Sequence, residues 1–534
     1  MNATNCGTPD VQGKHERRDA AWLEHALTEK YGVGERLTYT AFLQRTALRL
    51  PHKPALICED RTLSYAQMCD AIAGLAGYLG SACSVQEGQR VALLLENSDR
   101  YQLWYLAILA IGAIAVPLNT RLTAREIGYQ IENAGTFVIV SQQKFSAVLS
   151  EVGVAWIDAH AIEPASQPRF DIAGAPVKSD APAAIYYTSG TTGNPKGVVH
   201  THRNLIAGAV QGPPAWEFDD PSGVVLAMLP LFHIINHTAY LPVLHIGCTM
   251  VIDTFRTEVV LDLIVRREIT HLFAVPTMLL LMSQRHRVSG QDLSRVRTVS
   301  FGAAAMPPEK LAEVQRMFPR AGLVHGMGQT ESCGTIVTLP SRLAFDKAGS
   351  VGLHIDGTDM RVVDAAGRDV ASNTVGELLA RGPNVMSHYY ERPEATAETL
   401  AGGWLHTGDL GYLDEDGFLF LVDRKKDMII RGGENVYSSE VENVLYMHPG
   451  VAQVAVVAAR SELFGEEVFA FVARRQGAAE AAGLDEAALR AHCASYLAAY
   501  KLPVGIVFID AMPQTATGKV QKHVLRQQLP PQFR

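Results

Sequence analysis

Short apolar runs alternate with amphipathic segments from about residue 37 to residue 340. The runs are about four or five residues long, and the segments between them have apolar positions at helical spacing. Buried strands of an α/β sheet have this length and this apolar character. We therefore predict strands at residues 91–95, 137–140, 223–228, 249–252 and 272–275.

The pattern changes between residues 349 and 421, where short strand-like segments are separated by Asp/Gly turns. Such turns occur at residues 364–367 and 414–417. They favour tight connections between antiparallel strands, so this region is predicted to be antiparallel or barrel-like.

The charged run at residues 423–427 precedes a small α+β unit. Ser439 and Glu442 have the spacing of a capping box, which predicts a helix start. Val441, Val444 and Leu445 give that helix an apolar face, and a buried strand is predicted at residues 451–459. The last hundred or so residues are therefore expected to form a domain of their own.

Length and composition narrow the class of protein. A chain of 534 residues with 48% hydrophobic and 19% charged residues is globular and should contain at least two domains. The net charge of −8 disfavours a nucleic-acid partner, which would need a basic surplus. Seven scattered cysteines without a CxxC pair indicate reduced thiols.

The polar N-terminus has no apolar signal core, so we expect a cytoplasmic protein. Residues 101–120 carry no charge, but Gly112 and Pro117 interrupt them. We predict a buried helix followed by a strand there, and no transmembrane segment.

The segment from Tyr187 to Gly197 has the composition of a phosphate-binding loop. Glycines bring backbone N–H groups close to an anion, hydroxyl side chains add donors, and Lys196 adds a cation. It does not fit a Walker A motif, because Pro195 precedes the lysine. The candidate ATP-binding residues here are Thr188, Ser189, Gly190, Thr191, Thr192, Gly193 and Lys196.

This loop resembles the signature loop of the adenylate-forming superfamily, which includes acyl-CoA synthetases, aryl-CoA ligases and firefly luciferase. The resemblance covers about residues 40–528, with several motifs in the family's order. It implies ATP, Mg²⁺ and coenzyme A as cofactors and cosubstrates.

The segment from Gly326 to Glu331 resembles the family's second nucleotide motif, with Gly326, Met327, Gly328, Thr330 and Glu331 as binding residues. The resemblance gives Glu331 a magnesium-holding role, with Thr188 as its companion. Met327 stands where the family has an aromatic residue stacked on adenine, which predicts adapted adenine packing. Gly302, Ala303 and Ala304 belong to a stretch that resembles the other side of the adenine site, and single residues there could equally serve strand–loop packing.

Four further resemblances concern the ribose, the hinge, coenzyme A and catalysis. Asp409 and Arg424 match family residues that reach the ribose hydroxyls of the nucleotide, and Lys426 matches the family's hinge residue between the two domains. Gly432 and Gly433 match the loop that meets the pantetheine arm. Lys519, in the stretch Gln514–Lys519, matches the catalytic lysine.

The acid pocket is expected around the segment at residues 230–237. Its candidate residues are Phe232, His233, Ile234, Ile235, His237, Gly302 and Met306, with His233 as a gate or substrate neighbour. An amino-acid-activating domain normally has an aspartate where His233 stands, so we expect an acid without an α-amine. The apolar neighbours suggest an aliphatic or aromatic tail, although core packing explains them almost equally well.

The resemblance implies a fold of the α/β class. A large N-terminal domain of stacked α/β subdomains with a small barrel-like β part would span residues 1–425. A small mobile α+β domain carrying Lys519 would span residues 426–534. The expected reaction is activation of a hydrophobic acid as acyl-AMP, followed by thioester formation with coenzyme A. Two other functions remain alternatives, namely a ligase that loads a carrier protein and a non-catalytic nucleotide-binding relative. The protein could also be a homodimer.

Overall fold

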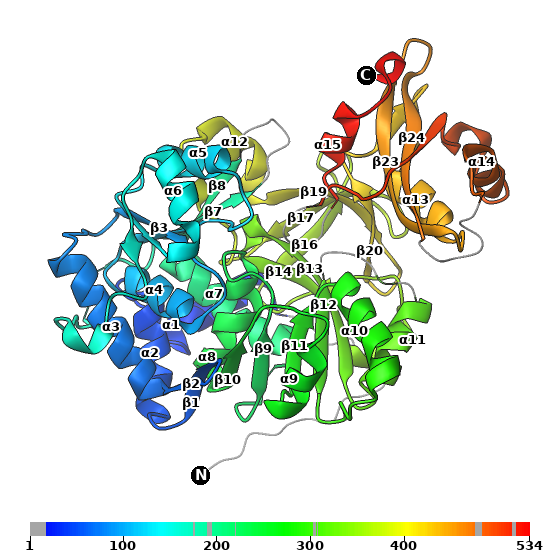
Figure 1. Ribbon diagram of the computed structural model, residues 1–534. Helices are drawn as coiled ribbons and strands as arrows, with labels where there is room; N and C mark the ends of the chain where they lie inside the picture. Colours follow the sequence, from blue (N-terminus) through cyan, green and yellow to red (C-terminus); the bar gives the residue numbers. More distant parts are fainter. Residues whose placement is uncertain are drawn as a thin grey trace.

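Two large sheets and the helices around them make up most of the molecule (Figure 1). The computed structural model describes residues 18–174, 177–188, 195–218, 220–302, 306, 308–475, 483–514 and 520–534. In spatial order, the nine-stranded sheet contains β15 (Leu353–His354), β14 (Gly334–Leu339), β13 (Gly322–Gln329), β12 (Thr298–Gly302), β11 (His271–Ala274), β9 (Val224–Ala227), β10 (Thr249–Ile252), β1 (Pro54–Cys58) and β2 (Arg61–Ser64).

The second sheet has seven strands and is parallel in its centre, where β3 pairs with β4 and β5. Its order is β18 (His388–Tyr389), β8 (Lys196–Thr201), β7 (Pro182–Thr188), β4 (Ile114–Pro117), β3 (Arg90–Leu94), β5 (Val138–Ser141) and β6 (Ile157–Asp158).

Helices cover both faces of each sheet. The largest apolar cluster joins the two sheets through α2 (Tyr39–Arg49), α3 (Tyr65–Ser81), α4 (Asp99–Ala110), α7 (His202–Ala215) and α8 (Leu241–Ile246). The outer face of the nine-stranded sheet packs against α9 (Val260–Arg266), α10 (Pro276–Ser289) and α11 (Pro308–Met317). The outer face of the other sheet packs against α5 (Ala124–Ala134) and α6 (Ser146–Val152). Helix α1 (Ala20–Glu29) adds Leu23 and Leu27 to the largest cluster, and α12 (Pro393–Thr399) packs beside β18.

Strand β3 shows why these strands have continuous apolar sequences. Val91 and Leu93 join the cluster between the sheets, whereas Ala92 and Leu94 join the cluster on the outer face. Successive strand residues point to opposite faces, so a strand covered on both faces must be apolar at every position.

Residues 359–424 form a four-stranded antiparallel sheet, as the Asp/Gly turns predicted. Its order is β16 (Asp359–Val363), β17 (Gly376–Arg381), β19 (Leu405–Leu413) and β20 (Leu419–Arg424). A small apolar cluster connects this sheet to β14 of the nine-stranded sheet.

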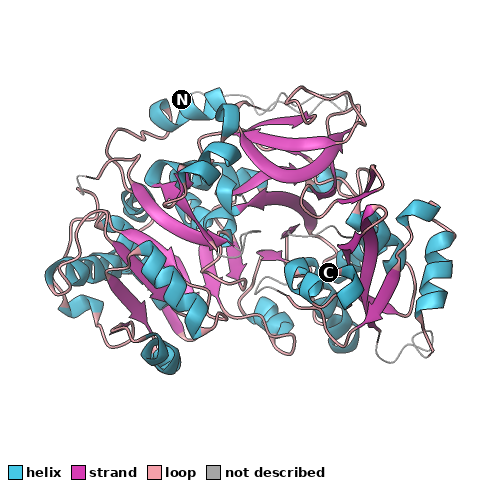
Figure 2. Ribbon diagram, turned by 90° about the horizontal axis from the view of Figure 1, so that it is seen from above, coloured by secondary structure: helices cyan, strands magenta, loops and turns pink. Residues whose placement is uncertain are grey.

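The chain beyond β20 forms a smaller α+β unit with its own apolar clusters, and both views show it standing apart from the larger body (Figures 1 and 2). Its strands are β22 (Glu434–Val436), β21 (Ile429–Arg431), β24 (Gly465–Arg474), β23 (Val451–Ser461) and β25 (Gly505–Phe508). Its helices are α13 (Ser438–Tyr446), α14 (Glu486–Ala494) and α15 (Lys522–Gln527).

The predictions made from apolar runs are confirmed. All five predicted strands coincide with β3, β5, β9, β10 and β11 to within one or two residues. The uncharged stretch at residues 101–120 forms most of α4, which is buried along its whole length, and then β4. Among the described residues, no helix has the length and apolar character needed to span a bilayer, and no disulfide joins the cysteines.

The predicted capping box at Ser439 and Glu442 is wrong. Helix α13 begins at Ser438 and has no side-chain cap from Tyr437, its N-cap residue. The Asp423 carboxylate at the end of β20 accepts the Ser438 and Ser439 N–H groups instead. Ser439 Oγ donates to the Val422 carbonyl, and Glu442 pairs with Lys522 at 2.8 Å. An acceptor from the preceding sheet therefore serves the helix start.

Candidate active site

The β7–β8 hairpin holds the two ends of the phosphate loop. Thr188 ends β7, Lys196 begins β8, and the two residues are direct partners across the hairpin. Ser189, Gly190, Thr191, Thr192 and Gly193 lie outside the described residues. The antiparallel pairing fixes the distance that the loop must bridge and places the Lys196 cation beside it.

A tyrosine connects Lys196 to Glu331. Lys196 Nζ lies 4.9 Å from the ring centroid of Tyr389, a cation–π distance. Tyr389 Oη donates a 2.8 Å hydrogen bond to Glu331 Oε1. Burial, together with the charge and hydrogen bond of Glu331, raises the pKa of Tyr389 well above its ordinary value, so the phenol remains a proton donor. Tyr389, which belongs to none of the sequence motifs, thus contacts both Lys196 of the first motif and Glu331 of the second.

Backbone contacts hold Glu331 in place. The Met386 N–H donates to the Glu331 carbonyl at 2.7 Å. His200 Nε2 lies 2.8 Å from the Thr330 carbonyl, which ties the second nucleotide motif to β8. Burial lowers the pKa of His200 to about 4, so the ring is neutral and Nε2–H is the donor.

Glutamate and threonine suit Mg²⁺, which is usually held by one or two carboxylates together with phosphates and water. The described residues contain no group of three His, Cys, Asp or Glu side chains able to hold an ion by themselves. A metal held by Glu331, with Thr188 nearby in the hairpin, would therefore depend on nucleotide phosphates for further ligands.

The glycines of the second nucleotide motif allow close packing. Gly302 and Gly326 are partners on the parallel strands β12 and β13. A β-carbon at Gly328 would lie 1.7 Å from the Gly334 carbonyl oxygen, so only glycine fits there. Ala303 and Ala304, next to Gly302, lie outside the described residues.

Met327 is half-buried and packs against the cluster that joins β14 to the four-stranded sheet. Its role beside adenine stays a prediction.

Asp409 and Arg424 face each other across β19 and β20. Arg424 Nε lies 3.0 Å from Asp409 Oδ1. The Asp409 N–H donates to Thr407 Oγ1 at 3.1 Å. The Asp409 side chain is 8% exposed, whereas that of Arg424 is 44% exposed. The two predicted ribose residues thus form one ion pair at the end of β20.

The interactions of the chain change at Lys426. Before it, Lys425 Nζ pairs with Glu377 of β17 at 3.1 Å, and the Lys425 N–H donates to the Gly408 carbonyl at 2.9 Å. After it, Asp427 pairs with Arg526 of α15 at 2.7 Å. Lys426 therefore lies between a residue tied to the four-stranded sheet and one tied to the C-terminal unit.

Gly432 and Gly433 form the two-residue turn between β21 and β22, whose flanking residues Arg431 and Glu434 are partners. Their φ values are 59° and 91°, the left-handed region that a tight hairpin of this kind needs at both positions. Arg431 fixes the base of the turn through Glu467 and by stacking 4.1 Å over Phe464.

Lys519 lies outside the described residues. A β-bridge between Gln514 and Val520 closes the loop that carries it. Val520 packs into an apolar cluster of the C-terminal unit, so the loop has a fixed base.

The residues expected to line the acid pocket do not all lie together. Phe232 and His233 are half-buried in a turn, while Ile234 and Ile235 belong to the cluster between the sheets. His237 is fully buried, and its Nε2 lies 2.6 Å from Tyr105 Oη.

Burial lowers the pKa of His237 well below its ordinary value, so His237 is a neutral core residue. Met306 lies in the cluster on the opposite face of the nine-stranded sheet, beside Phe301.

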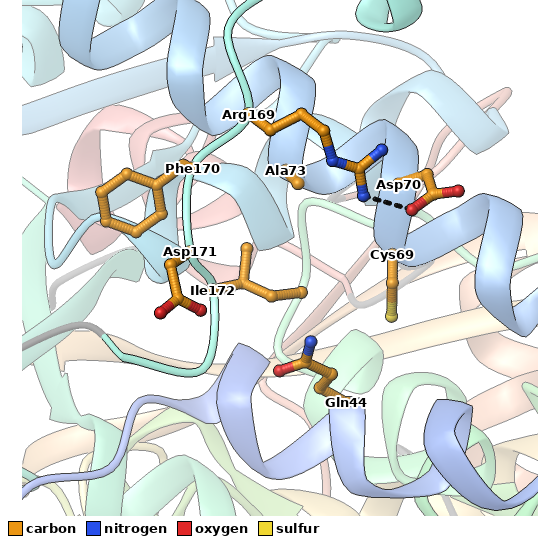
Figure 3. Close-up of a pocket in the computed structure, with 8 residues that line it drawn as sticks. All are labelled: Gln44, Cys69, Asp70, Ala73, Arg169, Phe170, Asp171 and Ile172. Carbon is orange, nitrogen blue, oxygen red and sulfur yellow. Dashed lines mark hydrogen bonds and ion pairs between the residues drawn. The ribbon is translucent and has the colours of Figure 1, made fainter.

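A surface pocket of about 340 Å³ lies away from these motifs (Figure 3). Residues of α2, α3 and the segment 169–172 line it, and Arg169 pairs with Asp70 at its edge. It contains none of the motif residues, so we do not place the active site there.

Comparisons with known proteins identify the family of the chain. Residues 43–390 match the AMP-binding enzyme family, and residues 440–519 match the AMP-binding enzyme C-terminal domain. A 2-succinylbenzoate–CoA ligase of Geobacillus kaustophilus is 34% identical, with 92% of this chain and 98% of that protein covered. A long-chain-fatty-acid–CoA ligase of Mycobacterium tuberculosis is 34% identical, with 88% and 93% covered.

Among solved structures, an o-succinylbenzoate coenzyme A synthetase of Bacillus subtilis, in complex with ATP and magnesium ion, is similar with a TM-score of 0.81. It is 33% identical, and the match covers 91% of this chain and 98% of that one. The chain belongs to the AMP-binding enzymes of the adenylate-forming superfamily, in the branch of the AMP-forming acyl-CoA synthetases.

Proposed function

We propose that this enzyme joins a hydrophobic carboxylic acid, either a medium- or long-chain fatty acid or an aryl acid, to coenzyme A. In the first step a carboxylate oxygen attacks the α-phosphorus of ATP, and pyrophosphate leaves. In the second step the coenzyme A thiol attacks the acyl carbonyl, and AMP leaves. The observation that carries the proposal is the Lys196–Tyr389–Glu331 arrangement beside the phosphate loop.

The first step brings two anions together, so cations and N–H donors must offset their repulsion. Lys196 is held at the loop by β8, and Glu331 is held by Tyr389 and Met386. Magnesium, when bound with the nucleotide, would neutralise phosphate charge. We assign Asp409 and Arg424 to the ribose hydroxyls and Lys519 to the reacting phosphate.

The second step requires the C-terminal unit to change position, with Lys426 as the hinge. The switch of contacts from Lys425–Glu377 to Asp427–Arg526 supports this assignment. Residues 1–425 and 426–534 would then move as two domains. Rotation would withdraw Lys519 and present Gly432 and Gly433 to the pantetheine arm.

The names of the relatives favour coenzyme A over a carrier protein as the acceptor. Those relatives act on acids as different as 2-succinylbenzoate and long-chain fatty acids, so the acid needs a direct experiment. Pyrophosphate release would be measured over aliphatic and aromatic acids, with and without coenzyme A. Acid-dependent release with a matching thioester product supports the proposal, and no acid-dependent release from any acid contradicts it.

A further inference from the structure

Trp216 fills the space beside two partnered glycines. From the position that a β-carbon would take at Gly326, Trp216 Cη2 is 2.2 Å away and Cζ3 is 2.7 Å away. A β-carbon at Gly302 would lie 2.7 Å from the Gly326 carbonyl oxygen and 3.7 Å from Phe273 Cζ. The benzo edge of the indole therefore packs directly on the backbone where β12 and β13 lie side by side.

The surrounding residues fix the position of this indole. Trp216 caps the C-terminus of α7, and the preceding Pro213 and Pro214 restrict the backbone. The Phe273 ring meets the indole edge-to-face at 4.7 Å and 85°. Ser300 Oγ of β12 donates to the Trp216 carbonyl at 3.4 Å. Trp216 is 2% exposed, so the packing around it holds the indole in one orientation.

The indole N–H has no acceptor among the residues that the structure describes. A buried donor without a partner is unfavourable, and native proteins rarely leave one unpaired. Tryptophans deep in the core usually find a partner, as Trp104 does with the Ala159 carbonyl at 3.3 Å. The N–H of Trp216 is thus available to an acceptor that a ligand supplies.

Trp216 also lies in the layer that contains the acid-binding segment. One turn earlier on α7, a β-carbon at Gly212 would lie 2.8 Å from the Thr238 carbonyl of the π-helical turn Asn236–Tyr240. Gly302 ends β12, and ligands of open α/β sheets bind at the carboxyl ends of strands. The indole therefore lies against the paired residues Gly302 and Gly326 near the end of β12, one helical turn along α7 from the contact with the Asn236–Tyr240 turn.

We propose that Trp216 closes the acid pocket against Gly302 and Gly326, so that the enzyme takes compact acids. We further propose that the indole N–H donates to an oxygen in the acid's tail. This inference rests on the proposed acid–CoA ligase function. It favours the aryl acids over the long-chain fatty acids named there, and it extends the substrate class to short oxygen-bearing acids. An aryl acid or a short aliphatic acid bearing an oxo or hydroxyl group fits, whereas an extended fatty acyl chain would run into the indole.

The test compares acids of increasing length, from butanoate to hexadecanoate, and acid pairs that differ in one oxygen, such as levulinate and pentanoate. Thioester formation is measured for the wild type and for Trp216→Phe, Trp216→Leu and Trp216→Ala. The wild type should prefer the oxygen-bearing member of a pair by about tenfold or more in kcat/KM, and Trp216→Phe should lose this preference.

Trp216→Leu and Trp216→Ala should move the length optimum toward longer acids, with a gain of about tenfold or more in kcat/KM for the long ones. Phe218→Leu is the matched control, because Phe218 is equally buried nearby but packs against His271. It should leave the length profile unchanged.

A second experiment does not depend on Trp216→Ala folding well. Gly326→Ala clashes with Trp216 Cη2, so it should lower activity and thermal stability, and Trp216→Leu in the same chain should restore part of both. Failure of Trp216→Leu to relieve Gly326→Ala overturns the packing on which the proposal stands.

The two claims can fail separately. If the wild type forms no thioester from any acid, the proposed function fails. If the wild type forms thioesters but folded Trp216→Leu and Trp216→Ala keep its length profile, the present inference alone is overturned. A preference for oxygen-bearing acids that survives in Trp216→Phe overturns the hydrogen bond.

Discussion

Tyr389 Oη donates a 2.8 Å hydrogen bond to Glu331 Oε1, although the two residues are 58 positions apart. The bond forms because β18, which ends at Tyr389, pairs with β8 and so brings this tyrosine to the edge of the phosphate loop. The same ring lies over Lys196 Nζ. One residue therefore contacts both the carboxylate predicted to hold the metal and the lysine predicted to bind phosphate.

Tyr389→Phe should weaken Mg·ATP use while leaving the ring over Lys196. Loss of one hydrogen bond to the charged carboxylate should cost about 1.5–3 kcal/mol, or roughly ten- to 150-fold in the KM for Mg·ATP. Steady-state kinetics over a magnesium titration measure this effect. Tyr390→Phe is the matched control, because the Tyr390 side chain packs in a different cluster. An equal loss in both variants would show a general packing effect.

Glu331→Gln should raise the magnesium requirement more than Tyr389→Phe does, because it removes the proposed ligand itself. If Tyr389 acts through Glu331, adding Tyr389→Phe to Glu331→Gln should cost little more. Additive losses in the double variant would separate the two roles. Unchanged activity of Glu331→Gln across the titration would exclude Glu331 as the metal ligand.

The fold was largely predictable because burial on both faces leaves a direct trace in the sequence. Strands such as β3 are apolar at every position because Val91 and Ala92 enter different clusters. The start of α13 was mispredicted because its cap comes from Asp423, on the strand of another sheet. Sequence spacing within a helix cannot reveal an acceptor that tertiary structure provides.

From the sequence, site residues could be proposed only where they belong to motifs, and those assignments stay predictions. Tyr389 was missed because a Tyr-Tyr pair after a loop is unremarkable in sequence, and its role follows from β18–β8 pairing. His237 was expected near the acid, but its burial with Tyr105 makes it a core residue. Trp216 gave no signal either, since its importance comes from two glycines far along the chain.

Asp409→Asn should weaken recognition of the ribose. The wild type should discriminate against 2′-deoxy-ATP, because this nucleotide lacks one of the two hydroxyl groups proposed to contact the Asp409 carboxylate. Arg424 would remain paired with Asp409 in either case. The variant should bind ATP less well and discriminate less, by roughly tenfold for each effect. The ratio of kcat/KM for ATP and 2′-deoxy-ATP is the readout. Equal discrimination by both proteins would remove Asp409 from the ribose site.

Buried histidines should make folding stability depend on pH below neutrality. Burial lowers the pKa of His202 to about 3 and that of His245 to about 3, against about 6.5 in the unfolded chain. Between these values the unfolded state binds more protons, so stability is fully present above pH 6.5 and is lost as the pH falls toward 3. Each histidine should contribute about 1.4 kcal/mol per pH unit in that window.

Urea unfolding at several pH values from 7 to 4 tests this dependence. His202→Asn should reduce the slope of stability against pH by about one histidine's contribution. The variant should still fold, because the asparagine amide oxygen can accept the hydrogen bond from the Tyr39 N–H that His202 Nδ1 accepts in the wild type. His52→Asn, at an exposed position, should leave the slope unchanged. The same slope in the wild type and His202→Asn would contradict the assignment.

Lys519→Ala separates the two steps of the proposed reaction. Loss of a cation at the reacting phosphate should slow the overall reaction by about 100- to 1000-fold, or roughly 3–4 kcal/mol. Arginine should not rescue it fully, because a planar fork replaces a point charge. Thioester formation from synthetic acyl-AMP and coenzyme A should persist. An equal fall in both reactions would contradict the division of labour between the two domain positions.

The most direct test of acyl-adenylate formation follows the acid's own oxygen. An acid that supports pyrophosphate release is labelled with ¹⁸O in its carboxylate, and the nucleotide product is analysed by mass spectrometry after thioester formation. Attack of the carboxylate on the α-phosphorus predicts AMP carrying one ¹⁸O and unlabelled pyrophosphate. Unlabelled AMP, or label in pyrophosphate or phosphate, would contradict the account.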